Sequence, residues 1–278
     1  MLIIMSSQLR SVSSLKQTLT GERVLITGAS GGIGREMAIS IAAKGGIPVL
    51  TARSEDKLRD LADVIYEQFG IKAPVYRLDV ADQDEVDKVI AAIYQNEGAI
   101  TTLINNAGYA IFDYIEEMRM EDARGMFDTN VLGTIACTKA VLPRMRKQRY
   151  GSIIFVASLA GKIATPKASA YSASKHAVIG FANAIRMETM DEPISVSTVN
   201  PGPIETDFFV RADKTGTYKE NVRSFMLEAG YVAERTVRLI MKPKREIEMP
   251  FLLSKAAKLY QLFPRLAERI AGKQMSRK

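Results

Sequence analysis

A tyrosine and a lysine stand four positions apart in the stretch AYSASKHAV (170–178), as Tyr171 and Lys175. Residues at this spacing share one face of a helix. A free phenol has a pKa of about 10 and is a poor acid or base at neutral pH, but a neighbouring ammonium group favours the phenolate and lowers that pKa. The pair could therefore exchange a proton with an alcohol or a ketone. Because exposed Tyr–Lys pairs share this spacing, the pattern alone leaves both interpretations open.

A glycine-rich stretch, TGASGGIG (27–34), falls between a short β-branched run at 23–27 and a helical pattern at 33–44. Backbone N–H groups and the helix dipole attract phosphate at such a junction, and glycine lets a pyrophosphate approach the backbone. The spacing of Gly28, Gly32 and Gly34 is G-x3-G-x-G. The stretch predicts a nucleotide site, and an ordinary tight turn is the plainer alternative.

The end of the second expected strand indicates which nucleotide would fit. An acid there would bond the ribose 2′-hydroxyl, whereas a cation suits a 2′-phosphate. The sequence has TARS, with Arg53 at this point and no acid before Glu55. We therefore expect NADP(H) rather than NAD(H), with a solvated surface arginine as the alternative reading of Arg53.

Alternating elements must position these groups. Apolar strand patterns at 23–27, 47–51, 75–79, 102–106, 152–158 and 194–200 alternate with helical patterns at 33–44, 55–69, 83–96, 123–146 and 168–190. Continuous apolar strands between amphipathic helices predict a doubly wound α/β fold, a parallel sheet of about seven strands with helices on both faces. We expect a leader at 1–20, a single domain at 21–250 and a basic tail at 251–278. Ser158, at the end of an expected strand, would then emerge at the carboxyl edge, near the nucleotide.

Four motifs together resemble the short-chain dehydrogenase/reductase family: TGASGGIG, NNAG (105–108), Ser158 and YSASK (171–175). The likeness runs from about residue 22 to about residue 206, and it implies a Rossmann-type fold. It implies a catalytic set of Asn130, Ser158, Tyr171 and Lys175. In that set Asn130 would hold a water that links Lys175 to solvent, and Lys175 would also bond the nicotinamide ribose.

The same resemblance extends the candidate cofactor site. Asp79 would meet the adenine, with a helix N-cap as its alternative role, and Asn105 would stabilise the sheet. The loop NPGPIET (200–206) would border the nicotinamide and its phosphates. The full expected set is Gly28, Ser30, Gly31, Gly32, Ile33, Gly34, Arg53, Asp79, Val80, Asn106, Ala107, Gly108, Tyr171, Lys175, Pro201, Gly202, Ile204 and Thr206.

These features predict an oxidoreductase that transfers hydride between NADP(H) and a carbonyl or secondary alcohol, working as an NADPH-dependent ketone or aldehyde reductase. A catalytically silent NADP(H)-binding regulator on the same fold is the alternative. The single histidine, His176, and single cysteine, Cys137, give no metal-ligand spacing, so we expect no metal. Ser158 in VASLAG lacks the G-x-S-x-G pattern of hydrolases. Phe208, Phe209 and Phe225 are candidates for an apolar cover over a small-molecule substrate, with ordinary packing as the alternative.

The net charge and the apolar runs of the chain indicate which partners the protein can bind. The 278 residues carry a net charge of +7, but residues 251–278 hold seven Lys and Arg against one acid, so the body is nearly neutral and we expect no nucleic-acid partner. No apolar run is long enough for a membrane span, and a lone cysteine suits a cytoplasmic location. The tail places Leu252, Ala256, Leu259 and Phe263 at helical intervals. Packing on the chain's own core or on a sister subunit of a dimer or tetramer is favoured over peripheral contact with anionic lipid.

Overall fold

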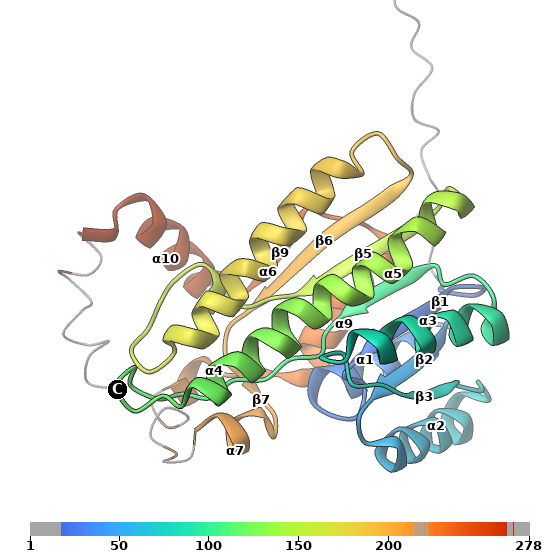
Figure 1. Cartoon of the computed structure of the whole chain (residues 1–278), viewed down its shortest axis with the longest axis horizontal. Helices are drawn as coiled ribbons and strands as arrows, with labels where there is room; N and C mark the ends of the chain where they lie inside the picture. Colours follow the sequence, from blue (N-terminus) through green and yellow to red (C-terminus); the bar gives the residue numbers. More distant parts are fainter. Residues whose placement is uncertain (1–17, 214–215, 217–219, 221, 266–268, 270–278) are drawn as a thin grey trace, which may run out of the picture.

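The protein is described by a computed structural model that covers residues 18–213, 216, 220, 222–265 and 269. Its centre is a seven-stranded sheet in the order β3-β2-β1-β4-β5-β6-β9, in which every neighbouring pair is parallel (Figure 1). The strands are β1 (Arg23–Thr27), β2 (Ile47–Ala52), β3 (Val75–Arg77), β4 (Thr102–Asn105), β5 (Gly151–Val156), β6 (Ile194–Pro201) and β9 (Glu246–Met249). The strand order reverses between β1 and β4, and such a reversal opens a crevice at the carboxyl edge of the sheet.

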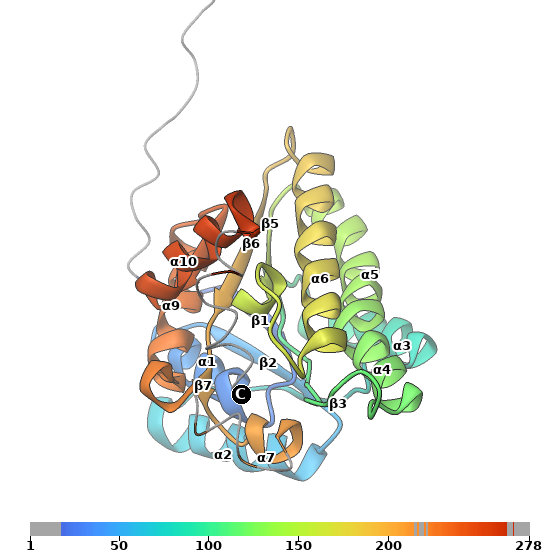
Figure 2. The ribbon, with the colours of Figure 1, turned by 90° about the vertical axis from the view of Figure 1, so that its left-hand side faces the viewer.

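Helices cover both faces of the sheet. One face packs against α1 (Gly32–Ala42), α2 (Glu55–Phe69) and α9 (Ala229–Met241), and the other against α3 (Gln83–Glu97), α5 (Gly133–Gln148) and α6 (Ser169–Glu188). Figure 2 shows these two helix layers on opposite sides of the strands. A strand covered on both faces must be apolar throughout, and all six residues of β5 are buried. The predicted doubly wound α/β fold is confirmed.

Some expected elements differ in extent. The helix expected over 123–146 consists of α4 (Met120–Phe127), a π-helical turn (Asp128–Leu132) and α5. The expected strand at 75–79 stops at Arg77, because β3 is an edge strand that pairs with β2 over three residues only. β9 and α9 were not located from the sequence, although Val232, Thr236 and Val237 in α9 are buried at helical spacing.

The segment after β6 is irregular in its described parts. It contains β7 (Ile204–Glu205), α7 (Phe208–Ala212), a 3₁₀ turn (Arg223–Phe225) and β8 (Leu227–Glu228), and β7 pairs with β8 in a small parallel sheet. Short elements of this kind bury little backbone and sit on the surface of the domain. They lie over the carboxyl edge of the main sheet, where they can shape a site.

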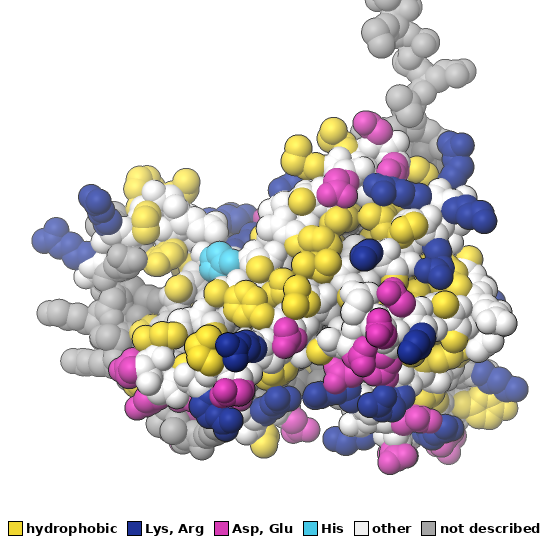
Figure 3. Space-filling view, in the orientation of Figure 1, with side chains coloured by type: hydrophobic (Ala, Val, Ile, Leu, Met, Phe, Trp, Pro, Cys, Tyr) yellow, Lys and Arg dark blue, Asp and Glu magenta, His cyan; other side chains and the backbone are white. Residues whose placement is uncertain are grey.

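The expected basic tail begins with α10 (Phe251–Leu262), which starts where that tail was expected to start. The apolar stripe was expected to pack on the chain's own core or on a sister subunit, and the core does not cover it: Leu252 is 77% exposed and Leu259 57% exposed. Ser254 and Ala257 form the buried face instead, because their small side chains allow close approach. Figure 3 shows apolar and basic side chains side by side on this part of the surface. Residues 1–17 of the expected leader at 1–20 and residues 266–268 and 270–278 of the tail fall outside the described residues. Among the described helices, none is long and apolar enough to cross a membrane.

Candidate active site

A cavity of about 590 Å³ lies at the carboxyl edge of the sheet. Its walls include the segments that follow β1, β4, β5 and β6, represented by Gly28, Asn106, Ser158 and Gly202. This volume is within the usual range for small-molecule sites. The strand ends on both sides of the β1/β4 reversal therefore contribute to one cavity.

The glycine turn has a backbone that requires glycine at two positions. Gly28 has φ +70° and Gly32 has φ +54°. A Cβ atom on Gly28 would lie 2.9 Å from the Cα of Ala107, whereas one on Gly31 would meet nothing within 4 Å. No side chain caps the first turn of α1. The turn thus leaves open space at a helix N-terminus, which suits a bound phosphate.

The wall formed after β4 is hydrogen-bonded to the glycine turn. The Asn106 side-chain amide donates to the carbonyl oxygens of Thr27, at 2.9 Å, and Gly28, at 3.1 Å. The Thr27 hydroxyl oxygen accepts from the backbone N–H groups of Asn106 and Ala107, both at 3.0 Å. Asn105 bonds instead to Thr138 on α5, at 3.1 Å. These bonds fix the distance between the two loops on either side of the strand reversal.

Most of the expected cofactor residues line this cavity. These are Gly28, Ser30, Gly31, Gly32, Ile33, Arg53, Asp79, Val80, Asn106, Ala107, Gly108, Tyr171, Lys175, Pro201, Gly202, Ile204 and Thr206. Gly34 is outside the wall, and a Cβ there would lie 2.2 Å from the Gly28 carbonyl oxygen. Its place is therefore in the close packing of α1 against the turn.

The part of the cavity at the carboxyl ends of β2 and β3 carries two cations. Arg53 follows β2, and Lys57 lies four residues later on α2; both line the wall. Lys57 was missed from the sequence, although its spacing from Arg53 was a usable signal. Asp79 also lines this end and accepts a hydrogen bond from the Ala81 N–H at 3.1 Å. Its alternative role as a helix N-cap is wrong, because Asp82 caps α3 by accepting from the Glu85 N–H.

The opposite end brings Ser158, Tyr171 and Lys175 together in the wall. Tyr171 and Lys175 stand on successive turns of α6, and the Lys175 Nζ atom is 5.9 Å from the centre of the tyrosine ring. Nζ also donates to the Val156 carbonyl oxygen, at 3.0 Å. The Ser158 hydroxyl donates to the Pro201 carbonyl oxygen, at 3.3 Å. Burial lowers the pKa of Lys175 from 10.5 to about 8, so the ammonium form still predominates at neutral pH.

Asn130 lies behind this wall and does not line it. Its π-helical turn points the side chain at the Tyr109 backbone, where Oδ1 accepts from the N–H at 3.0 Å and Nδ2 donates to the carbonyl at 2.9 Å. Nδ2 also donates to the Ser174 hydroxyl, at 3.0 Å. Such π-turns occur frequently at functional sites. Asn130 therefore joins the loop after β4 to α6, one residue before Lys175.

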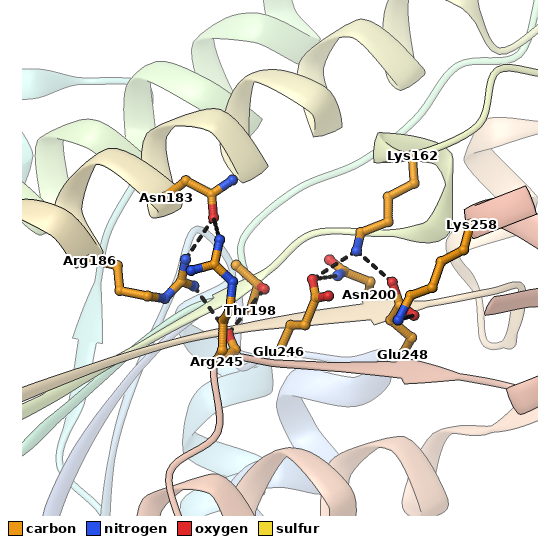
Figure 4. Close-up of polar contacts among 9 residues, drawn as sticks. All are labelled: Lys162, Asn183, Arg186, Thr198, Asn200, Arg245, Glu246, Glu248 and Lys258. Carbon is orange, nitrogen blue, oxygen red and sulfur yellow. Dashed lines mark hydrogen bonds and ion pairs between the residues drawn. The ribbon is translucent and has the colours of Figure 1, made fainter. Parts of the chain in front are cut away.

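The segment after Ser158 is fastened by a buried lysine. Lys162 follows the 3₁₀ turn Leu159–Gly161 and is 9% exposed. Its Nζ atom donates to Glu246 at 2.7 Å and also to Glu248, both on β9 (Figure 4). Lys258 of α10 pairs with Glu248 at 3.3 Å. No sequence pattern indicated this network, because its members are far apart in the chain.

Aromatic rings surround Tyr171. Phe208, Phe209 and Phe225 all line the cavity, as expected of a cover. Phe112, which was missed, lies edge-on to Tyr171 with ring centres 5.9 Å apart, and Phe208 is 5.9 Å away from Tyr171 as well. The polar groups of Ser158, Tyr171 and Lys175 are therefore set in an apolar wall.

The remaining candidates lie outside the cavity wall. His176 is exposed on α6 and bonds the Ser172 carbonyl oxygen at 2.8 Å. Cys137 is buried in the core, and burial raises the pKa of its thiol to about 12. Among the described residues, no group of three His, Cys, Asp or Glu side chains could hold a metal ion.

Comparisons with known proteins agree with this geometry. The family model of the short chain dehydrogenases matches residues 22–216. An NADP-dependent 3-hydroxy acid dehydrogenase of Schizosaccharomyces pombe is 37% identical over 194 residues, which cover 69% of this chain and 75% of the relative. A short chain dehydrogenase/reductase of Burkholderia phymatum, solved in complex with NAD, has a TM-score of 0.83 at 25% identity and covers 89% of this chain and 95% of its own. The closed form of a serine dehydrogenase complexed with NADP+ has a TM-score of 0.75 at 27% identity and covers 82% and 94%.

Proposed function

The chain belongs to the short-chain dehydrogenase/reductase family, and from that premise we propose that it is an NADPH-dependent reductase of ketones or aldehydes. One observation carries the proposal: the glycine turn and the side chains of Ser158, Tyr171 and Lys175 line the same cavity. A dinucleotide that spans this cavity would reach both ends of it. A regulator without turnover has no physical need for these three side chains around one space.

The residues present fit NADP(H). The open space at Gly31 and the uncapped first turn of α1 suit the pyrophosphate. Arg53 and Lys57 would hold the 2′-phosphate through charge-assisted hydrogen bonds. Asp79, Val80 and Asn106 would border the adenosine, and Pro201, Gly202, Ile204 and Thr206 the nicotinamide half. NADPH, when bound, supplies the hydride for the carbonyl carbon.

Tyr171 is the proposed proton donor. Its hydroxyl would give a proton to the carbonyl oxygen as negative charge develops there. The buried Lys175 ammonium lies beside the phenol ring and would stabilise the negative charge left on the tyrosine oxygen. Ser158 would release its bond to Pro201 and donate to the same carbonyl oxygen, which orients the substrate.

Lys175 and Asn130 would assist the reaction at Tyr171 without donating the proton. The bond from Lys175 Nζ to the Val156 carbonyl oxygen uses one of the three ammonium donors and leaves two for the nicotinamide ribose and for water. Asn130 holds the backbone of Tyr109 and the Ser174 hydroxyl. We propose that it positions Lys175 through these contacts and keeps room for a water at the lysine.

NADPH oxidation with a panel of carbonyl compounds tests this function. Turnover should need an intact Tyr171, and the Tyr171→Phe variant should keep NADPH binding while losing turnover. Full turnover in that variant would reject the mechanism. Tight NADPH binding without turnover of any compound, in the intact protein, would favour a regulatory role.

We also propose that the chain is a homo-oligomer and that the exposed side of α10 contacts a second copy. Phe251, Leu252 and Leu262 are each more than 70% exposed on this helix, and several exposed large apolar side chains on one element are typical of an interaction surface. Lys258 already pairs with Glu248, which leaves less free positive charge for anionic lipid. These features support a protein contact over a membrane contact.

A further inference from the structure

We propose that the substrate is an uncharged carbonyl compound with an aromatic or similarly bulky apolar group, and that compounds carrying a carboxylate near the carbonyl are poor substrates. The inference rests on the proposed reductase function and narrows it. It concerns the wall that surrounds Tyr171, away from the cations at Arg53 and Lys57. By its name, the relative from Schizosaccharomyces pombe acts on hydroxy acids, so this chain would differ from it in substrate class.

The wall beside Tyr171 is apolar. Phe112 and Phe208 each have their ring centre 5.9 Å from that of Tyr171, and Phe209 is 5.7 Å from Phe208. The apolar lining of the cavity includes Phe112, Ile163, Phe208, Phe209, Phe225 and Leu253. Edge-to-face contacts with aromatic rings favour another ring in the space between them. The ring of an aryl ketone bound beside Tyr171 would pack against these aromatic side chains.

The charged groups of the described wall do not suit an anion here. Arg53, Lys57 and Asp79 follow β2 and β3, at the nucleotide end. Lys175 donates one bond to Val156, and the proposed function assigns its other two donors to the nicotinamide ribose and to water. The remaining charged side chain of the described lining is Asp207, an acid at the start of α7. A substrate carboxylate would be repelled by Asp207.

Three cations outside the wall, among the described residues, are engaged elsewhere. Lys162, close to Ser158 in sequence, points toward Glu246 and Glu248 (Figure 4). Arg211 lies over the Tyr109 ring, 3.7 Å from its centre, and Lys167 lies over the Tyr114 ring at 5.0 Å. None of the three lines the cavity. A carboxylate moved into this space would lose its hydration without a countercharge from these three described cations, which is unfavourable.

Three compounds separate the effect of substrate charge on turnover from the effect of an aromatic ring: methyl benzoylformate, benzoylformate and methyl pyruvate. The first two differ in charge, and the first and third differ in the ring. With NADPH saturating, kcat/KM for methyl benzoylformate should exceed that for benzoylformate by at least about 100-fold and that for methyl pyruvate by about 10-fold. Turnover of benzoylformate within a few-fold of its ester would overturn the proposal.

The ester and the acid also differ in intrinsic reactivity. This difference cancels when the acid-to-ester ratio of kcat/KM is compared between protein variants, because every variant is measured with the same two compounds. Phe225→Arg adds a cation to the wall and should raise the benzoylformate-to-ester ratio by about 10-fold. Phe263→Arg adds the same cation at an exposed position outside the wall and should leave the ratio unchanged. Phe208→Ala should lower the preference for the phenyl ester over methyl pyruvate. Equal ratios in Phe225→Arg and Phe263→Arg would count against the apolar wall.

Binding distinguishes failure of this inference from failure of the proposed function. If compounds of the wider carbonyl panel are reduced but none of these three is, only the substrate inference fails. If NADPH is oxidised neither with these three compounds nor with any compound of that panel, the reductase function fails. The substrate class is then judged by the thermal stability of the protein with NADP+. Stabilisation by the ester and not by the acid supports the apolar site, whereas equal stabilisation by both compounds rejects it.

Discussion

The Lys175 Nζ atom donates a hydrogen bond to the Val156 carbonyl oxygen, 3.0 Å away, so the ammonium group on α6 is held at the end of β5. Val156 is the last residue of that strand, two positions before Ser158. This hydrogen bond therefore holds Lys175 against β5, the strand that Ser158 follows. The group it holds is charged and buried, and this combination has a measurable consequence for stability.

Folding should become more favourable as the pH rises from about 8 to 10.5. Burial lowers the pKa of Lys175 to about 8, whereas the unfolded chain keeps the ordinary value of 10.5. Between these values the unfolded chain binds more protons, so raising the pH stabilises the fold, by on the order of 3 kcal/mol over the window. Thermal unfolding across this range, with wild type measured against Lys175→Met, isolates the contribution. A constant difference between the two proteins would show that Lys175 titrates normally.

Replacing Tyr171 with phenylalanine should reduce kcat by about 1,000-fold, because it removes the proton donor and leaves the ring in place. The T-shaped contact with Phe112 needs only the ring, so the fold should be kept. Steady-state NADPH oxidation measures the loss. NADPH affinity and the melting temperature serve as controls, and a variant that keeps both but still turns over substrate would rule out Tyr171 as the donor.

The Arg53→Asp variant should shift cofactor preference from NADPH toward NADH. The change removes a countercharge for the 2′-phosphate and adds an acid that can accept from a ribose hydroxyl. We expect the ratio of kcat/KM values, NADPH over NADH, to fall by about 100-fold, and Lys57→Ala to lower it less. Arg77→Asp, on an exposed residue outside the wall, is the matched control. Identical ratios in Arg53→Asp and this control would remove Arg53 from the cofactor site.

The Lys162→Met variant should be destabilised by on the order of 3 kcal/mol, because it leaves two carboxylates without their shared buried partner. Burial alone would raise the pKa of Glu246, but the hydrogen bond and charge of Lys162 outweigh it and lower that pKa. The stability that Glu246 contributes is thus present above its ordinary pKa and is lost as the pH falls through the lowered value. Urea unfolding at several pH values measures both effects.

Lys162→Arg keeps the charge and should restore most of that stability. Since Lys162 also fastens the segment after Ser158, the methionine variant should raise KM more than it lowers kcat. Arg238→Met, which removes an exposed pair with Glu234, is the control and should change stability by less than about 1 kcal/mol. Equal losses in Lys162→Met and Arg238→Met would contradict a structural role for the buried network.

A double substitution, Leu252→Glu with Leu259→Glu, should shift the protein to a smaller species in light scattering. Both side chains are exposed on α10, so the change costs little folding free energy but places charge in the proposed contact. Tyr66→Glu, exposed on α2, should leave the mass unchanged. If the wild type is monomeric and sediments with anionic vesicles, and the double variant does not sediment with them, this surface binds lipid and not a sister subunit.

The sequence by itself determined the fold class and the local chemistry. Alternating strand and helix periods require a covered parallel sheet, and the glycines at 28 and 32 mark a turn that other residues cannot easily adopt. The Tyr171–Lys175 spacing fixed their shared face through helix geometry alone. These features depend on neighbours along the chain, and local sequence is sufficient for them.

Only the tertiary structure decided which distant groups meet. Phe112 reaches Tyr171 on α6, and Lys162 reaches Glu246 on β9, because the segments after β4 and β5 pack against these elements. It also turned the apolar side of α10 outward and placed Asn130 behind the wall, where the sequence pattern had no information on direction. Contacts between residues far apart in the chain depend on how elements pack in three dimensions, and no local spacing encodes them.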